Sequence, residues 1–375
     1  MPAKENKKIA ATKKRKTELI LPKEDDFRNH QLELFQSFLC NDKAERDKLS
    51  NTVDLWDSIP KYSVSRQAMH KLRSGGGFLE LLELEFKYRG KTFQVIIQPA
   101  RIKEDDGTTR DYYPGANEEL IEDALRKIAA DQYQGYFDKP NFRSGVVFSL
   151  YILRQELTKR GHARSYQEIV KSLKILSGSL IEIRSPDGDE TQAFSRANYF
   201  PALAAVSKYK LQQDHSAKWV VQFHPLVTQS IDALTYRQYN YHQMMAQSTQ
   251  LARWIHKQLS LKYTFANYDN VFEILYSTIR RDSAMINYKR DRDGIVAVDK
   301  AFQELQGCSV IIRFEKREML GSRGKIQDVR YVLYPSPDFI RGMKAANKRL
   351  SDATNMALGK PANNASIPVY RDKNR

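Results

Sequence analysis

The fold of this chain is decided by residues 309–334, which read SVIIRFEKREMLGSRGKIQDVRYVLY. Two arms rich in β-branched and aromatic residues, Ser309–Lys316 and Ile326–Tyr334, are separated by Arg317–Lys325, which is rich in Arg, Lys and Gly. This is the pattern of a β-hairpin with a basic tip. Alternation predicts that one face of each arm is buried. The residues on those faces are Val310, Ile312 and Phe314, and then Val329, Tyr331 and Leu333.

Three helices are predicted ahead of this hairpin, because apolar residues recur there at helical spacing. The first carries the stripe Met244, Met245, Leu251, Trp254, Ile255 and Leu259. A short second helix covers Asn270–Ile279. The third has a buried face formed by Ile295, Val298, Phe302 and Leu305, and it extends back through Tyr288. Three helices followed by a hairpin is the order of a winged helix.

The same order is predicted once earlier in the chain. A first helix carries the stripe Leu120, Ile121, Ala124, Leu125, Ile128 and Ala129. A second helix covers Val146–Leu157, and Ser165 opens a third through a capping box with Glu168. The strands predicted around these helices are a hairpin of Phe78–Tyr88 with Thr92–Gln98, and then Ser179–Arg184, Gln192–Tyr199 and Lys218–His224.

We therefore predict an α+β protein with two tandem winged-helix domains and a flexible basic N-terminal arm. Residues 1–50 form the arm, and residues 51–234 form the first domain with an N-terminal β-hairpin extension. Residues 235–344 form the second domain, which begins with a polar, Tyr-rich connection at Thr235–His242. Residues 345–375, rich in Asn, Ala and Lys, are predicted to be a tail.

The charge of the chain indicates a polyanionic partner. Lys and Arg total 61 against 45 Asp and Glu, a formal net charge of +16 in 375 residues. Such an excess is typical of proteins that bind nucleic acid, although a basic protein can also simply be well solvated. The longest apolar runs fall short of the roughly 20 residues that span a bilayer. We expect a bacterial cytoplasmic protein, associated with DNA and not with a membrane.

Signatures of enzymatic chemistry are missing from the sequence. It has no P-loop and no His-x-His pair, so we expect no catalytic residue, no metal and no cofactor. Tyr236, Tyr239 and Tyr241 could be imagined as nicking nucleophiles, but no metal site or basic cluster accompanies them. We interpret them as packing residues between the domains. His224 and His256 are expected to be structural.

The third helix of the second domain is predicted to read DNA. Opposite its apolar stripe, or flanking that opposite face, are Asn287, Lys289, Arg290, Arg292 and Lys300. In the major groove Arg reads guanine and Asn reads adenine, which suits such a helix. A solvated basic face is the alternative. Asp291, Asp293 and Asp299 favour that alternative, because each would repel phosphate.

Contacts with the DNA backbone are predicted from two further places. The tip of the hairpin offers Arg317, Arg323 and Lys325, which could follow the backbone or the minor groove. The third helix of the first domain, with the residues just ahead of it, offers Arg164, Lys171 and Lys174. We expect phosphate contacts from the first domain and base reading mainly from the second.

A protein partner is indicated by QLELF at residues 31–35. This pentapeptide resembles the QL[S/D]LF peptides by which bacterial replication proteins hold the DNA polymerase sliding clamp. In such a peptide the amide of Gln31 is hydrogen-bonded at one end, and Leu34 and Phe35 enter an apolar pocket at the other, with Leu32 between them. The alternative is a short amphipathic helix, Leu32–Leu39, packed on its own domain.

The basic arm, QLELF, two predicted winged helices and the missing catalytic motifs together resemble the plasmid replication initiators of the TrfA/RepA type. The resemblance is strongest at QLELF and over Gln243–Tyr334, where FQELQG at 302–307 looks like the end of that family's last recognition helix. It implies that monomers bind repeated origin sites (iterons) in double-stranded DNA, that an adjacent AT-rich element opens, and that a homodimer formed through the first domain is the inactive state.

The resemblance also implies partners and regulation. The partners are the host initiator, the replicative helicase, the sliding clamp and single-stranded DNA, and the regulated quantity is plasmid copy number. Val53–Pro114 departs from the family, because this segment is longer and differently patterned than expected. Two other functions remain open: a winged-helix transcriptional regulator that never meets the clamp, and an enzyme that nicks DNA.

Overall fold

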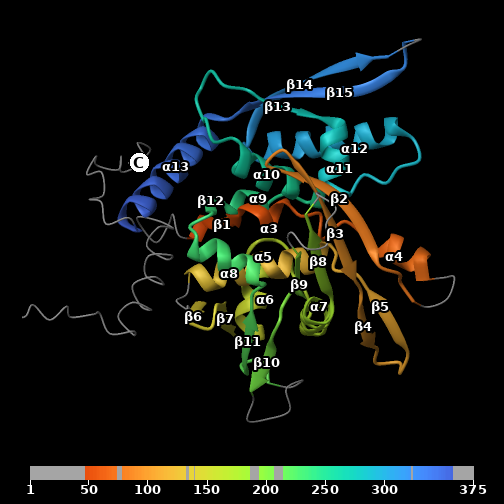
Figure 1. The fold of residues 1–375 in the computed structure, drawn as a ribbon, viewed down its shortest axis with the longest axis vertical. Helices are drawn as coiled ribbons and strands as arrows, with labels where there is room; N and C mark the ends of the chain where they lie inside the picture. Colours follow the sequence, from red (N-terminus) through yellow and green to blue (C-terminus); the bar gives the residue numbers. More distant parts are fainter. Residues whose placement is uncertain are drawn as a thin grey trace, which may run out of the picture.

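The computed structural model describes residues 47–73, 78–131, 135–138, 140–185, 194–206, 214–321 and 324–357. The described part mixes helices and sheets around two hydrophobic cores (Figure 1). The first core gathers buried residues from Val53 to Met245, and the second gathers those from Leu251 to Met343. We call the two parts of the chain that form them the first half and the second half.

The first half contains most of the strands. Its elements are β1 Leu49–Val53, α3 Asp54–Ser58, α4 Arg66–Arg73, β2 Leu82–Tyr88, β3 Lys91–Gln98, β4 Ala100–Lys103, β5 Thr109–Tyr112, α5 Ala116–Asp131, β6 Gly135–Asp138, β7 Arg143–Phe148, α6 Leu150–Lys159, α7 Tyr166–Gly178, β8 Leu180–Arg184, β9 Phe194–Asn198, β10 Leu203–Val206, β11 Lys218–Gln222, α8 Pro225–Asp232, β12 Tyr236–Asn240 and α9 Tyr241–Met245. The larger sheets have the strand orders β2-β3-β8-β9 and β10-β11-β7-β6, while β1 pairs with β12 and β4 with β5. Helix α5 packs against α6, α7 and β7.

Several local predictions for the first half are confirmed. The hairpin β2–β3 turns at Arg89 and Gly90, whose φ values of 48° and 81° suit a tight type I′ turn. Ser165 and Glu168 form both hydrogen bonds of the predicted capping box at the start of α7.

The predicted helix Val146–Leu157 is wrong at its start. Residues as far as Phe148 belong to β7, which pairs with β6 and β11, and α6 begins only at Leu150. The β-branched pair Val146 and Val147 favours a strand. Helix α6 starts where it does because the Oγ of Ser149 accepts the N–H of Ile152 at 3.2 Å. One apolar run therefore serves two elements.

The second half follows the order helix, strand, helix, helix, strand, strand, helix. Its elements are α10 Gln250–Lys262, β13 Phe272–Leu275, α11 Tyr276–Ser283, α12 Asp291–Gly307, β14 Ile311–Leu320, β15 Ile326–Pro335 and α13 Pro337–Ala357. The sheet has the strand order β13-β15-β14. The predicted hairpin is confirmed as β14–β15, which projects at the top of the molecule with α12 beneath it (Figure 1).

Three predictions for the second half are corrected. Asn270–Ile279 is not one helix, because Phe272 to Leu275 pair with β15 as β13 before α11 begins. Met244 and Met245 lie in α9, which is separate from α10 because the Oγ1 of Thr249 accepts the N–H of Ala252 and so starts a new helix. Ile312 is exposed, because a register shift between Ile311 and Arg313 turns it away from the core.

The predicted connection and part of the predicted tail are packed structure. Thr235–His242 contains strand β12, which pairs with β1, and its residues Tyr236, Tyr239 and Tyr241 are buried, so their interpretation as packing residues is confirmed. Residues 345–357 belong to α13, which packs on β12. Small apolar residues at helical spacing, including Ala346 and Ala353, make this contact possible.

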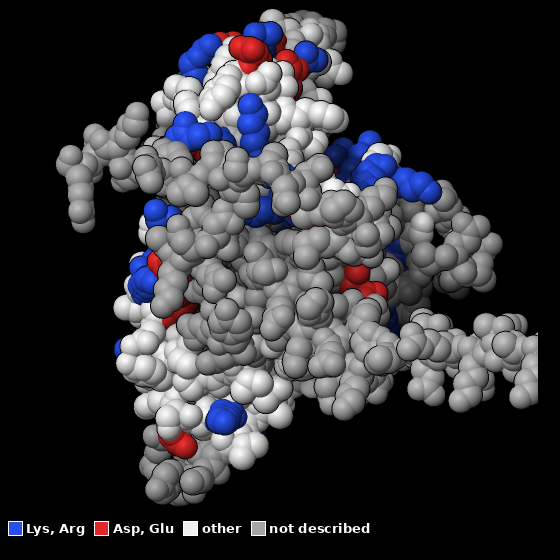
Figure 2. Space-filling view, turned by 90° about the vertical axis from the view of Figure 1, so that its left-hand side faces the viewer, with Lys and Arg blue, Asp and Glu red and all other residues white. Residues whose placement is uncertain are grey.

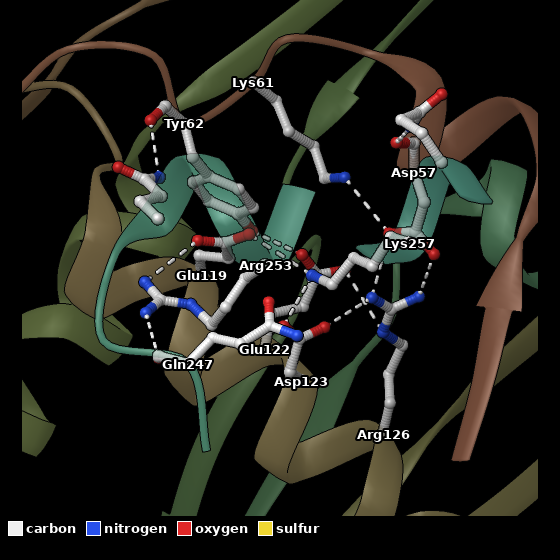
Figure 3. Close-up of polar contacts among 12 residues, drawn as sticks. Asp57, Lys61, Tyr62, Glu119, Glu122, Asp123, Arg126, Gln247, Arg253 and Lys257 are labelled. Carbon is white, nitrogen blue, oxygen red and sulfur yellow. Dashed lines mark hydrogen bonds and ion pairs between the residues drawn. The ribbon is translucent and has the colours of Figure 1, made fainter. Parts of the chain in front are cut away.

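The two halves meet at a group of buried charged side chains, which we call the junction cluster (Figure 3). Its members are Asp57, Lys61, Glu119, Glu122, Asp123, Arg126, Arg253 and Lys257. Across the junction, the Nζ of Lys257 on α10 lies 2.5 Å from Asp123 Oδ2 and 3.3 Å from Glu119 Oε1 on α5. Arg126 donates from both Nη atoms to Asp57, at 2.8 Å and 2.9 Å. Ion pairs therefore fasten α10 of the second half to α5 of the first.

Candidate nucleic-acid interface

The candidate interface is centred on α12, an amphipathic helix. Its predicted buried face is confirmed, and that face consists of Ile295, Val298, Phe302 and Leu305. The opposite side exposes Arg292, Val296 and Lys300, which lie at i, i+4 and i+8 on one face. A Cβ on Gly294 would lie 2.2 Å from the Oη of Tyr276, so glycine at this position allows α11 to approach α12 closely.

The helix starts later than predicted, so part of the predicted reading face lies in a turn. Helix α12 begins at Asp291, with Arg290 as its N-cap residue. Asn287 and Lys289 are therefore exposed residues of the turn between α11 and α12. The turn begins because Ala284 adopts a left-handed conformation after α11. The acidic residues Asp291 and Asp293 favour a helix N-terminus at this position.

Two of the three aspartates of α12 are paired within the protein. Asp291 lies 2.7 Å from Arg280. Asp299 accepts a hydrogen bond from the Tyr331 hydroxyl at 2.8 Å and lies 3.2 Å from the Nζ of Lys316. These contacts reduce the repulsion that the sequence predicted against phosphate. Asp293 is exposed and, within the described residues, makes no ion pair.

The basic residues predicted to contact DNA from α12 and the hairpin differ from these acids, because most of them form no ion pair with a described residue. Five are exposed and make no ion pair with any residue that the structure describes: Lys289, Arg290, Arg292, Lys300 and Lys325. Arg317 is the exception, since it lies 3.2 Å from Glu315. We call these six residues, together with Asn287, the α12 surface. Its excess positive charge is available to an external anion.

The hairpin β14–β15 has a fixed base and an exposed outer part. At the base, Arg313 stacks on the ring of Tyr334, 3.6 Å from its centroid. Hydrogen bonds from the Tyr334 hydroxyl, Arg313 and Arg317 lower the pKa of Glu315 to about 2, so this carboxylate is ionised at neutral pH. Beyond Glu315, every residue of β14 is exposed. The outer part of the hairpin is therefore free to contact a partner.

The sequence predictions missed apolar residues near the tip of this hairpin. Met319, Leu320 and Ile326 are 41%, 62% and 46% exposed. Met319 and Leu320 lie within the basic, Gly-rich segment and Ile326 follows it directly, and apolar residues at a solvated tip are the signal that could have identified them. Arg323, predicted as a tip contact, lies outside the described residues, as do Gln31, Leu32, Leu34 and Phe35 of QLELF.

The cations predicted in the first half are more engaged with the protein than those of the α12 surface. Arg164 donates to the Oδ1 of Asn117, and the Nζ of Lys171 lies 2.7 Å from Glu104. Lys174 is exposed on α7, and no described residue forms an ion pair with it. In the face drawn in Figure 2, the Lys and Arg side chains also gather in the upper part, where Figure 1 places the second half.

The histidines expected to be structural occupy buried positions. His224 stacks on Trp56, and its Nδ1 accepts the N–H of Leu226 at the start of α8. Burial lowers the pKa of both His224 and His256 to about 3, so both rings are neutral at pH 7. Among the described residues, no group of His, Cys, Asp and Glu side chains is arranged to hold a metal ion. None of the helices described here is both long and apolar enough to cross a membrane.

Comparison with known proteins gives weak structural likenesses only. No protein-family model and no curated protein sequence matches this chain. Two crystal structures of RctB domains 2 and 3 are similar to it, with TM-scores of 0.47 and 0.44, 10% identity, and coverage of 74% and 70% of this chain and 97% and 93% of theirs. The Pi initiator protein in complex with iteron DNA has a TM-score of 0.42 and 12% identity, over 64% of this chain and 98% of that one. These values are too low to assign a function by similarity.

Proposed function

We propose that this chain is a non-enzymatic replication initiator that binds repeated sites in double-stranded origin DNA. The observation that carries the proposal is the α12 surface, where five exposed cations form no ion pair with any residue that the structure describes. Cations inside a folded protein are normally paired, whereas those that bind phosphate are left exposed for it. On this proposal, α12 enters the major groove and Arg290 and Arg292 read base edges from its N-terminal end.

The order of elements supports a winged helix in the second half. Helices α10, α11 and α12 are interleaved with β13 and followed by the hairpin β14–β15, whose second strand pairs with β13. We assign the same module to the first half, from α5, α6 and α7 followed by β8 and β9. That half departs from the simple pattern, because β7 pairs with β6 and β11 and not with the strands that follow α7. We assign it phosphate contacts through Lys174 and dimerisation.

Recruitment of the replication machinery rests on the sequence. QLELF is the part of the resemblance to plasmid initiators that distinguishes an initiator from a transcriptional regulator. On this proposal Leu34 and Phe35 bind the sliding clamp, while the chain opens an AT-rich element and recruits the helicase. The burial of Tyr239 and Tyr241 argues against the nicking alternative, because a nucleophilic hydroxyl must reach the DNA backbone.

Selection of DNA tests the first part of the proposal. The full-length chain is incubated with a random pool of duplexes, and bound duplexes are amplified over several rounds. A replication initiator of this type is expected to enrich one sequence, with a log–log salt slope near −0.9 for each phosphate contacted. A pool without enrichment, together with a flat response to salt, would contradict DNA recognition.

A clamp pull-down tests the second part. Immobilised sliding clamp is expected to retain the wild-type chain and to release the variant with Leu34→Ala and Phe35→Ala. The matched control is Leu39→Ala, which changes an apolar residue outside the pentapeptide. Equal retention of all three proteins would favour the transcriptional regulator.

A further inference from the structure

The tip of the β14–β15 hairpin presents an exposed apolar group on one face. Leu320 and Ile326 are cross-strand partners, and the register shift between Met319 and Leu320 is a bulge. The extra residue is Gln327 on β15, so β14 keeps its alternation: Leu320 and Ile326 share one face, while Met319 lies with Asp328 on the other. The backbone N–H of Gly321 donates to the carbonyl of Lys325 at 2.8 Å and closes the tip beside them.

The sequence of the hairpin carries an excess of cations. Residues 311–335 carry Arg313, Lys316, Arg317, Arg323, Lys325 and Arg330, against Glu315, Glu318 and Asp328. Period-two alternation places Arg317 and Arg330, which are register partners, on the face opposite Leu320 and Ile326, and it places Lys316 on the same face as Leu320. Cations in the middle of the hairpin therefore precede the apolar pair on both of its faces.

The exposed apolar residues and the neighbouring cations of the hairpin favour a DNA duplex over a protein as the binding partner. A stable protein interface buries about 800 Å² on each partner, whereas this tip offers three side chains on a ribbon of two strands. A minor groove about 6 Å wide admits such a narrow element, and its phosphates attract the flanking cations. Apolar side chains such as Leu, Ile and Met enter base steps in DNA that is bent by proteins.

The contact between the hairpin and α12 fixes the distance between the helix and the tip. Lys316 contacts Asp299 of α12 at 3.2 Å, and Leu320 lies four residues further along the strand. At ~3.3 Å per residue, the tip stands about 13 Å beyond that contact. A helix in the major groove and a tip at that distance can therefore engage neighbouring grooves of one duplex.

We propose that Leu320 and Ile326 form a wedge that enters a base step in the minor groove and unstacks it, kinking the duplex beside the site contacted by α12. This inference rests on the proposed function, since it requires that α12 binds DNA. Arg317 and Lys325 hold the phosphates on either side. The wedge thereby supplies a local distortion from which strand opening can start.

The test compares two sets of substitutions on the enriched duplex. One variant carries Leu320→Ser and Ile326→Thr, and the control carries Ile312→Ser, a similar apolar-to-polar change at the base of the same hairpin, where Ile312 is 55% exposed. Unstacking is measured by permanganate reactivity of thymines and by fluorescence of 2-aminopurine placed at successive positions. Kinking is measured by energy transfer between dyes on the two duplex ends.

Wild type and Ile312→Ser are expected to give one unstacked step and a shortened end-to-end distance. The double variant is expected to bind with an unchanged salt slope, roughly threefold to tenfold more weakly, and to leave the DNA stacked and straight. Thermal unfolding of all three proteins should coincide, because the changed side chains are exposed. The proposed wedge is wrong if the double variant still unstacks the base step. It is also wrong if wild type leaves the duplex stacked. Failure of the proposed function is a different result, in which wild type enriches no duplex at all.

Discussion

The junction cluster and the α12 surface are built from the same kinds of charged residue in opposite surroundings. In the junction cluster, acids and bases are buried together, and Lys257 and Arg126 each contact more than one carboxylate. On the α12 surface, Lys300 and Arg292 are exposed, and no described residue neutralises them. The difference shows that residue type alone does not reveal the role of a charge. What matters is whether the protein itself supplies the partner.

The neighbouring charges in the junction cluster also set the pKa values of Asp57 and Lys257. Burial alone would raise the pKa of Asp57, but Arg126 and Lys61 outweigh burial and hold that pKa well below its usual value. Burial likewise opposes the charge of Lys257, yet Asp123 and Glu119 raise its pKa above the usual range. Both groups therefore stay charged at neutral pH, and removing one partner leaves an uncompensated charge in a buried site.

Replacing one lysine in each region should give the largest difference between the two regions, which is a difference in the free energy of unfolding. Lys257→Met leaves Glu119 and Asp123 without their shared ammonium and is expected to lower the free energy of unfolding by about 3–5 kcal/mol. Lys300→Met makes the same change on the exposed face of α12 and is expected to alter it by no more than about 0.5 kcal/mol. Urea unfolding followed by circular dichroism measures both. If Lys257→Met changes the free energy of unfolding as little as Lys300→Met does, the junction cluster does not stabilise the fold.

Lowering the pH should produce the next largest effect on the free energy of unfolding, and we expect it to act through the buried junction cluster. Because the folded pKa of Asp57 lies below the unfolded value of about 3.9, its stabilisation is complete above that value and is lost as the pH falls below it. The free energy of unfolding is therefore expected to fall between about pH 4 and pH 2. In Asp57→Asn this dependence should be shallower, at a lower starting stability. Parallel curves for the two proteins would assign the acid sensitivity to other carboxylates.

On the exposed side, Arg290→Ala should weaken binding to the enriched duplex by about 1–3 kcal/mol and relax the preference at one base position. The reason is that a base-reading arginine makes contacts that only one base pair can satisfy. Arg110→Ala is the matched control, since Arg110 is exposed in the first half and is held by Asp106 at 2.9 Å. Fluorescence anisotropy at fixed salt measures both affinities. A loss that is the same for every base at every position would make Arg290 a phosphate contact.

The elements of both regions were largely predictable, because their patterns are local. The buried face of α12, the hairpin β14–β15 and the capping box of Ser165 follow from spacing within a few residues. The start of α12 was misplaced, because the apolar stripe continues to Tyr288 although the helix begins only at Asp291. Apolar spacing reports which face is buried, whereas the capping residues decide where a helix begins.

The junction cluster was not predictable in this way. Residues 118–127 read EELIEDALRK, and their apolar positions gave α5 a single buried face. The charged positions Glu119, Asp123 and Arg126 look like an ordinary solvated side of such a helix. They are buried because α10, more than a hundred residues later, brings Lys257 against them. Only the tertiary contact distinguishes a buried charge from a solvated one with the same local sequence.

The smallest expected effect is a change in the salt dependence of DNA binding, and it tests one exposed charge specifically. Lys300→Met removes one phosphate contact, so it should weaken binding to every duplex alike and lower the steepness of the log–log salt dependence by about 0.9. Lys159→Met, at an exposed lysine paired with Asp47, should leave that slope unchanged, because no counterion is released there on binding. Titrations at several salt concentrations separate the two. A slope that Lys300→Met leaves unchanged would place this lysine outside the DNA contact. The same substitution that spares the fold should therefore be the one that alters the response to salt, while Lys257→Met acts on the fold alone.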